Sequence, residues 1–487
     1  MSIFERKTIE HIKEASESSP LRRDLSLPVL TLLGVGATIG AGVFVLTGNA
    51  AANYAGPAVA LSFVFAAVAC LFAGLCYAEL SSMIPVSGSA YTYSYVSMGE
   101  IVAWLIGWNL VLEYMFAVSA VAVGWSGYFS AFVRDLGLTI PEGMTEPLFA
   151  ASASGGLALS GAVLNFPAVA VVLAMTGVLS LGMRASAGAN ALMVAIKVGV
   201  ILLVIGVGSF YVDAQNYIPF VPEPDEASGR FGWAGVITAA GVVFYAYIGF
   251  DAVSATSLEA KNPRRDVPLA ILLTLAICTA LYVGMSVVMT GLAPYALLNV
   301  PHPIYVAIEH VGPALAWLKP IIGISVIVGL ASTILVALYG QTRVFYAMAM
   351  DGLIPQIFSR INLRTNVPAF NTWFVGCCAA LVAGMFPLAM LGELISIGTL
   401  LAFSIVCLGV LVLRFTAPDA ERPFRVRYIW PVSLAGLGMC VYMMLSLPGD
   451  TWQRFGVWLA LGGAIYLFYG YRSSKLRRVV AFGAMPR

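Results

Sequence analysis

TLLGVGATIGAGVFVLTGNAAAN, residues 31–53, is the stretch that decides the fold. It is apolar enough and long enough to span a bilayer, yet it carries four glycines between positions 34 and 42. Glycine is a poor helix former, although small residues also let a neighbouring helix approach closely. The pattern therefore predicts a membrane helix that is broken near Thr38–Gly42, with freed backbone groups that line a cavity or a ligand.

The composition sets the class of protein. Of 487 residues, 60% are hydrophobic and 10% are charged, and the mean hydropathy is +0.90. A soluble domain carries roughly 25% charged residues, so we predict an all-α polytopic membrane protein. Hydrophobic runs predict twelve transmembrane helices, near 29–54, 57–83, 99–132, 167–183, 188–213, 232–258, 267–292, 314–350, 368–387, 390–414, 429–447 and 452–471.

The distribution of basic residues predicts the orientation. Most of the 26 Lys and Arg residues lie in the two tails and in alternate connections between the predicted spans. Basic connections stay on the cytoplasmic side, so both termini should be cytoplasmic in a cell membrane protein. We expect an N-terminal tail (1–26), one transporter core (27–414), two further helices (415–471) and a basic tail (472–487).

Two connecting segments receive expectations of their own. The basic run Arg472–Arg478 follows the last span, and contact with anionic lipid headgroups is its ordinary explanation. The loop 135–165 is rich in Gly, Ala and Ser, and we expect an extracytoplasmic cap with some local helix.

The first ten predicted spans divide into two halves of almost equal length. Spans 1–5 cover about 29–213 and spans 6–10 cover about 232–414, and an odd number of spans gives the second half the opposite topology. Each half opens with an interrupted helix, because span 6 combines aromatic residues and a glycine around Tyr245–Gly249. Equal halves of opposite topology are typical of secondary transporters that bind substrate at mid-membrane.

The direction of the two broken helices predicts what they bind. Beyond the break in span 1 a half-helix starts with free N–H groups, the positive end of its dipole, which suits a carboxylate. The first half of span 6 ends in free carbonyls, which suit an ammonium together with the carbonyl of Ile39. A free amino acid carries both groups. The predicted substrate-binding residues are Thr38, Ile39, Gly40, Ala41, Gly42, Tyr245, Ala246 and Ile248.

Several segments resemble the amino acid–polyamine–organocation permeases, and most closely the cationic amino acid transporter branch with its bacterial relatives. The similar segments are GVGATIGAGVFVLTG at 34–48, GWNLVLEY at 107–114, AVAVGWSGYFSAF at 120–132, FYAYIGFDAVSATSLEAKNPRRDVP at 244–268 and YGQTRVFYAMAMDGLIP at 339–355. The resemblance covers spans 1–10. It implies a leucine-transporter-like five-plus-five inverted repeat with two extra helices. It also implies that the span 1 glycines hold the substrate carboxylate and that span 6 carbonyls help to hold the amine. A bacterial member of this branch can prefer neutral amino acids, so the branch name does not decide the substrate.

Lys197 lies near the middle of span 5, where an unpaired ammonium is expensive. One interpretation is a lysine that reaches along the helix to the cytoplasmic interface. The other is a titrating lysine that takes the place of a bound sodium ion, and its position in span 5 resembles that in proton-coupled members of the family. The expected partners are carbonyls near Gly36 and the hydroxyl of Ser332 or Thr333.

Two acidic residues also lie within predicted spans. Glu113 in span 3 has several open roles: a pair with Lys197, a second proton carrier, a contact to a basic substrate, or a buried structural hydrogen bond. Asp251 follows the break in span 6 and is expected to cap the second half-helix.

We therefore predict a secondary active amino acid transporter that imports small neutral amino acids with protons by alternating access. The alternatives are a cationic amino acid or polyamine permease or exchanger, and a transporter-like amino acid sensor. The three scattered histidines give no metal site, and no nucleophile–base pair or nucleotide motif is present, so neither an enzyme nor a cofactor is predicted. The expected partners are the amino acid, the proton and the lipid bilayer, without nucleic acid; a small membrane subunit stays an open question.

Overall fold

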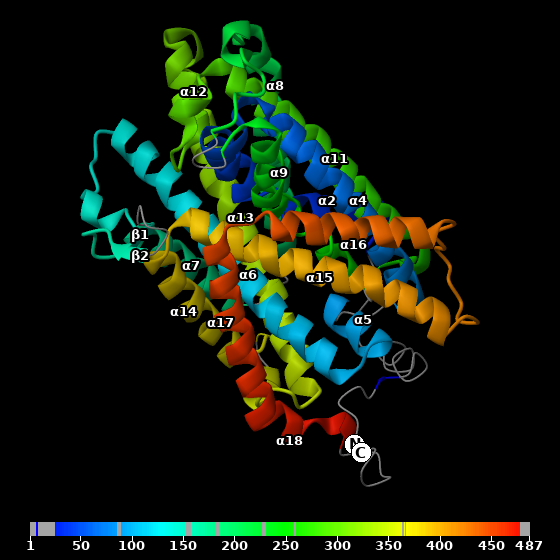
Figure 1. Ribbon diagram of the computed structural model, residues 1–487. Helices are drawn as coiled ribbons and strands as arrows, with labels where there is room; N and C mark the ends of the chain where they lie inside the picture. The colour runs from blue at the N-terminus through cyan, green and yellow to red at the C-terminus, as the bar shows by residue number, and fades with distance from the viewer. Residues whose placement is uncertain are drawn as a thin grey trace.

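The computed structural model describes residues 6–7, 25–84, 89–151, 157–181, 186–225, 230–257, 260–362, 365 and 367–477. It is a bundle of helices (Figure 1), and a helix occupies each of the twelve ranges that the hydrophobic runs predicted. Within the described residues, seven helical stretches are long and apolar enough to cross a membrane. The pair α16–α17, bent by 109°, forms an eighth candidate. The chain is therefore a helical membrane protein.

The helices differ widely in length. The long ones are α4 (Val59–Met83), α6 (Glu100–Asp135), α8 (Ser186–Gly208), α11 (Pro263–Leu292), α13 (Leu318–Met350), α14 (Ala369–Met385), α15 (Leu388–Thr416), α16 (Ile429–Leu445) and α17 (Gly449–Ile465). The short ones are α2 (Leu27–Thr38), α3 (Thr47–Ala50), α5 (Ser89–Ser97), α7 (Phe166–Ser180), α9 (Gly232–Val243), α10 (Ala252–Ala255), α12 (Pro303–Val311) and α18 (Tyr471–Ser473).

The packing surrounds the two helices that were predicted to be interrupted. Helix α6 packs against α13 and α15, and α4 packs against α11, α9 and α16. Helix α2 lies against α11 and α8. The stretch Gly232–Ser254 is the most buried of the seven candidate spans, since 83% of the residues in its most apolar 18-residue segment are buried within the protein. A span shielded from lipid in this way can leave helical geometry, because protein groups are available to satisfy its backbone.

Three features outside the long helices differ from expectation. The loop 135–165 contains a short antiparallel hairpin, β1 (Phe149–Ala151) with β2 (Leu157–Leu159), in addition to the local helix that was expected. Its helical content among the described residues is one 3₁₀ turn, at Glu142–Met144. Helices α5 and α12 were not predicted, because nine residues are too few for a hydrophobic span to be recognised. Helices α12 and α18 lie at opposite ends of the molecule (Figure 1).

Parts of both tails meet at one end of the bundle. The ammonium of Lys7 lies 2.6 Å from a carboxylate oxygen of Asp351, and the Lys475 N–H donates to the Asp351 carbonyl at 3.0 Å. The guanidinium of Arg477 lies 2.9 Å from the buried carboxylate of Glu100, at the start of α6. The sequence predicted that the basic run contacts lipid headgroups. Arg477 is only 7% exposed, so this residue is not available to them. Most of the 1–26 tail, and 478–487, lie outside the described residues.

Candidate functional site

The first predicted interruption is confirmed. Helix α2 ends at Thr38, and Ile39 turns the chain out of helical geometry with ψ 102°. A π-helical turn then starts at Gly42 and leads into α3. The first N–H groups of a helix have no partner within it, so the start of this second half presents free donors to whatever lies in front of it.

The second predicted interruption is confirmed as well. Helix α9 ends at Val243 and continues as a 3₁₀ turn, Phe244–Tyr247. The backbone is then extended at Ile248, with ψ 132°, and left-handed at Gly249, with φ +122°. Helix α10 begins only at Ala252, so several carbonyls of the preceding turn lose the N–H partners that a continuous helix would supply.

The two breaks touch each other through backbone atoms. A Cβ added at Gly42 would lie 2.4 Å from both Cα and Cβ of Ala246. A Cβ added at Gly249 would lie 2.7 Å from the carbonyl carbon of Ala37 and 2.8 Å from the nitrogen of Thr38. Neither position has room for a side chain, so the glycines allow two interrupted helices to form a single site.

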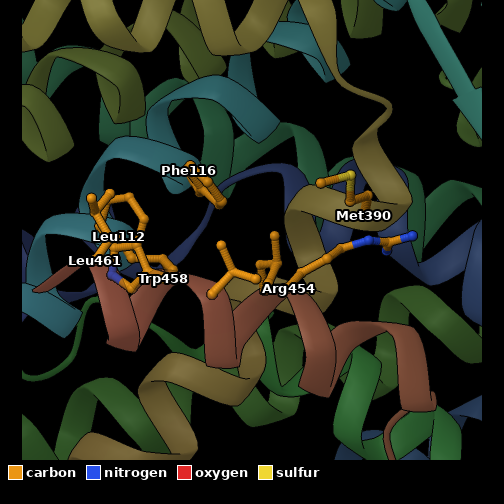
Figure 2. A pocket seen from close by; sticks show the side chains of 8 residues that line it. Leu112, Phe116, Met390, Arg454, Trp458 and Leu461 are labelled. Atoms are coloured by element: carbon orange, nitrogen blue, oxygen red, sulfur yellow. The ribbon is translucent and has the colours of Figure 1, made fainter. Parts of the chain in front are cut away.

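An apolar cavity of about 270 Å³ lies elsewhere, between α6, α15 and α17 (Figure 2). Leu112 and Phe116 of α6, Met390 of α15, and Arg454 and Trp458 of α17 are among the residues that line it. None of its lining residues belongs to either break. It contributes no group to the site described here.

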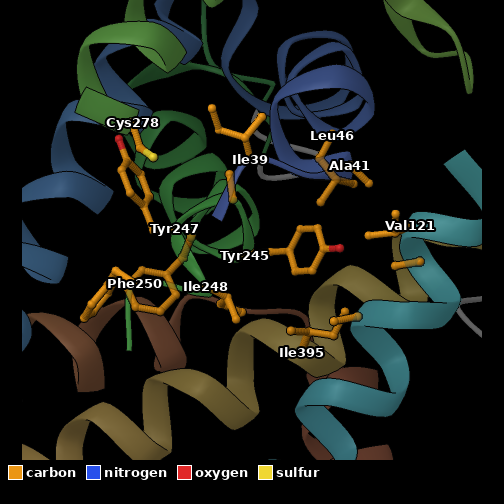
Figure 3. Close-up of a cluster of buried hydrophobic side chains, with 14 of the residues drawn as sticks. Ile39, Ala41, Leu46, Val121, Tyr245, Tyr247, Ile248, Phe250, Cys278 and Ile395 are labelled. Carbon is orange, nitrogen blue, oxygen red and sulfur yellow. The ribbon is translucent and has the colours of Figure 1, made fainter. Parts of the chain in front are cut away.

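Apolar side chains surround the breaks (Figure 3). The ring of Tyr245 extends from the 3₁₀ turn toward Val121 of α6, and Ile395 of α15 lies below it in this view. Ile248 and Tyr245 are 9% and 6% exposed, so the site is closed to solvent in this conformation. Backbone groups supply the polarity of the site, and these side chains supply its walls.

Lys197 of α8 is fully buried and binds the end of α2. Its ammonium nitrogen lies 2.5 Å from the Gly36 carbonyl, 2.9 Å from the Ile39 carbonyl and 3.1 Å from the Thr333 hydroxyl of α13. The contacts predicted with Gly36 and Thr333 are therefore present. Three acceptors match the three N–H donors of a protonated lysine. Ser332 does not take part, because its hydroxyl donates to Gly329 at 2.8 Å.

Small residues let α8 approach closely enough for this contact. A Cβ added at Gly36 would lie 2.5 Å from a methyl group of Val194. A Cβ added at Gly329 of α13 would lie 2.9 Å from the Cβ of Lys197. The close-approach interpretation of glycine in span 1 and the broken-helix interpretation therefore both hold, at different glycines.

The Ile39 carbonyl lies between Lys197 and Thr333. Lys197 donates to it at 2.9 Å, and the Thr333 hydroxyl lies 3.1 Å away. A carbonyl oxygen has two lone pairs, and both have a protein donor within reach here. The Ile39 carbonyl, which was predicted to help hold a substrate ammonium, therefore already faces the Lys197 and Thr333 donors in this structure.

The two buried acids are not partners of Lys197 in the described part of the chain. Both carboxylate oxygens of Glu113 are buried, and neither has a hydrogen-bond partner among the described residues. One oxygen of Asp251 accepts the Gly249 N–H at 3.2 Å, across the break. Asp251 stands before α10 but makes no side-chain cap there, so the predicted cap is wrong and the residue holds the left-handed turn instead.

Tyr282 is a residue at the breaks that the sequence did not single out. Its hydroxyl oxygen lies 2.9 Å from the Thr38 carbonyl and 2.8 Å from the Ala246 carbonyl. It stands on α11, among many apolar residues of a predicted span, and no spacing or motif marks it.

The chain is similar to known membrane permeases along almost its whole length. Residues 25–465 match the family model described as amino acid permease. The chain is 43% identical to a methylthioribose transporter of Bacillus subtilis, over 98% of this chain and 100% of the relative. It is 43% identical to a branched-chain amino acid permease of the same organism, over 98% and 99%. It is 40% identical to the vacuolar cationic amino acid transporter 2 of Arabidopsis thaliana, over 87% and 64%.

Proposed function

Because this chain belongs to the amino acid permease family, we propose that it is a secondary active transporter that imports small neutral amino acids together with protons. It works by alternating access in the cell membrane, with twelve spans, a five-plus-five inverted repeat in 27–414, two further helices in 415–471 and both tails in the cytoplasm. The observation that carries the proposal is the binding of one buried ammonium, Lys197, to the backbone of a broken helix.

The substrate is held by the two breaks. Its carboxylate binds the N–H groups at the start of the second half of span 1, beside Gly42. Its ammonium binds carbonyls that still have a free lone pair. The Thr38 and Ala246 carbonyls are within reach of one hydroxyl, which leaves each of them an acceptor site. Contact between Gly42 and Ala246 supports a site in which both ends of the amino acid are bound at once.

The side-chain pocket favours apolar or small substrates. Val121, Ile248 and Ile395 present hydrocarbon toward the breaks, and a cationic side chain would need an acidic partner there. One relative is named for branched-chain amino acids, whose side chains are apolar, and another for methylthioribose.

A cationic substrate is the second candidate, and Glu113 is the observation that favours it. Its buried carboxylate has no hydrogen-bond partner among the described residues, so it has the capacity to receive a cationic group. A relative named as a cationic amino acid transporter is consistent with this alternative.

The place of Lys197 between three helices supports the proposed proton coupling. The lysine is on α8, and its acceptors are on α2 and α13. If the first half of span 1 moves during transport, Gly36 and Ile39 move away from the ammonium and its stabilisation is lost. Proton affinity then differs between the two conformations, and by linkage the proton shifts the conformational equilibrium by the same free energy. Thr333 belongs to this coupling site, while Ser332 contributes only to the local packing of α13.

Counterflow in proteoliposomes tests the proposal. The panel contains labelled alanine, serine, leucine, arginine, lysine, a polyamine and methylthioribose, at two external pH values. Alanine, serine or leucine should exchange and compete, and their methyl esters should compete poorly because they lack the carboxylate. Exclusive competition by arginine and lysine would support the cationic alternative. Exclusive exchange of methylthioribose, or equal competition by esters and free acids, would overturn the amino acid site. Binding without exchange would point to a sensor.

A further inference from the structure

Tyr282 of α11 joins the two breaks with a single hydroxyl group. Its oxygen lies 2.9 Å from the carbonyl of Thr38, the last residue of α2, and 2.8 Å from the carbonyl of Ala246, in the 3₁₀ turn of span 6. The side chain is fully buried. No other described side chain is a hydrogen-bond partner of both interrupted segments.

Both carbonyls need such a donor because of the breaks. In a continuous α-helix the Thr38 carbonyl would accept from the N–H of Gly42, and the Ala246 carbonyl from that of Phe250. The extended backbone at Ile39 and Ile248 separates each pair. A buried carbonyl without a donor is costly, and more so at membrane depth.

One hydroxyl cannot satisfy both carbonyls at the same time. A tyrosine has one O–H proton, so it donates to one carbonyl and leaves the other without a donor at any instant. The two carbonyl oxygens carry like partial charges and repel each other, and the hydroxyl proton attracts both. A substrate group with N–H donors would satisfy the carbonyl that the hydroxyl leaves without a donor.

We propose that Tyr282 is a positioning residue for the α-ammonium of the substrate, an inference that rests on the proposed function. It holds the Thr38 and Ala246 carbonyls close enough for one ammonium to reach both. The ammonium supplies the second hydrogen-bond donor, which the single hydroxyl of Tyr282 cannot provide. The ammonium is therefore bound most strongly when the Thr38 and Ala246 carbonyls lie close together, and Tyr282 holds them at that separation.

The surroundings of the ring keep the hydroxyl in place. The Tyr282 ring packs against Phe63, at 5.6 Å between ring centroids, and against Tyr247, at 5.3 Å. The Tyr247 hydroxyl takes no part in these ring contacts and donates to the Phe63 carbonyl of α4 at 3.0 Å. Tyr247 therefore offers a matched control, since its hydroxyl belongs to the same aromatic cluster but donates to α4.

The test compares Tyr282→Phe with Tyr247→Phe, each of which keeps a ring and removes one buried hydroxyl. Binding of an α-amino acid and of the α-hydroxy acid with the same side chain, alanine and lactate, is measured by competition in counterflow. In Tyr282→Phe the discrimination between alanine and lactate should fall by about tenfold, the effect expected for the loss of one hydrogen-bonding group. In Tyr247→Phe the discrimination should stay at the wild-type value.

The outcomes separate this inference from the proposed function. Discrimination that is unchanged or stronger in Tyr282→Phe, while wild type binds alanine, would overturn the positioning role alone. Equal loss in both variants would make the cluster merely structural, and so would a Tyr282→Phe protein that fails to fold when Tyr247→Phe folds. A folded wild type that binds neither ligand would overturn the proposed function and this inference with it.

Discussion

Adding a single methyl group at Gly42 should separate the two halves of the binding site. In Gly42→Ala the new Cβ would lie 2.4 Å from both Cα and Cβ of Ala246. Carbon atoms in contact prefer about 3.5–4.0 Å, so the two breaks would have to move apart by about 1 Å or more. Overpacking of this kind costs about 1–3 kcal/mol. At the proposed site, where the breaks meet, this cost should weaken substrate binding by roughly 5- to 150-fold.

The assay is substrate binding to purified protein, with thermal unfolding as a check on folding. Gly177→Ala is the matched control, because a Cβ there meets no atom within 4 Å and substrate binding should be unchanged. Ala246→Gly in the Gly42→Ala background removes one of the two clashing atoms and leaves the Cα, so it should restore binding only in part. Wild-type binding in Gly42→Ala would refute direct contact of the breaks at the substrate.

Other parts of the structure lead to three further predictions. Glu79→Gln should lower the free energy of unfolding by about 3–5 kcal/mol, because the Arg414 guanidinium, which lies 2.7 Å from the Glu79 carboxylate, loses its buried charged partner. Glu421→Gln, in an exposed ion pair, should lower the free energy of unfolding by less than about 1 kcal/mol. Burial lowers the pKa of His302, so this histidine binds a proton more readily in the unfolded chain than in the folded protein. The thermal midpoint should therefore fall as the pH drops below about 6.5, and His302→Gln should make it less dependent on pH. Arg477→Gln should release the segment 474–477 from the start of α6, with faster tryptic cleavage after Lys475; unchanged cleavage at Lys475 would contradict a docked tail.

The sequence was sufficient to predict the breaks and the main lysine contacts. Glycines inside an otherwise helical apolar run indicate both interruptions, and the direction of each helix then assigns the sign of charge that each end attracts. Lys197 had to find acceptors because it is charged and lies at mid-membrane, and few polar groups were available there. Carbonyls near Gly36 and the hydroxyl of Ser332 or Thr333 were named as its partners together with the family resemblance, in which spans 1, 5 and 8 meet.

The sequence was not sufficient wherever the rotation of a helix decides the outcome. Successive residues of a helix point about 100° apart, so Ser332 and Thr333 were equivalent candidates until the orientation of α13 was known. The double occupation of the Ile39 carbonyl depends on the same rotation. Tyr282 was missed for a different reason: a tyrosine in an apolar span is an ordinary core residue unless the carbonyls opposite it are free. Those carbonyls are free only because of breaks in two other helices.

The most direct test of the account is accumulation of substrate by proteoliposomes in sodium-free buffer, with and without an inward proton gradient. The comparison is between wild type and Lys197→Met, which keeps an unbranched apolar stem and removes the ammonium that binds Gly36, Ile39 and Thr333. We expect wild type to accumulate substrate only with the gradient. The variant should lose accumulation but keep counterflow, because backbone groups of the two breaks hold the substrate. Undiminished gradient-driven accumulation in Lys197→Met, or a wild type that requires sodium, would contradict proton coupling through this lysine.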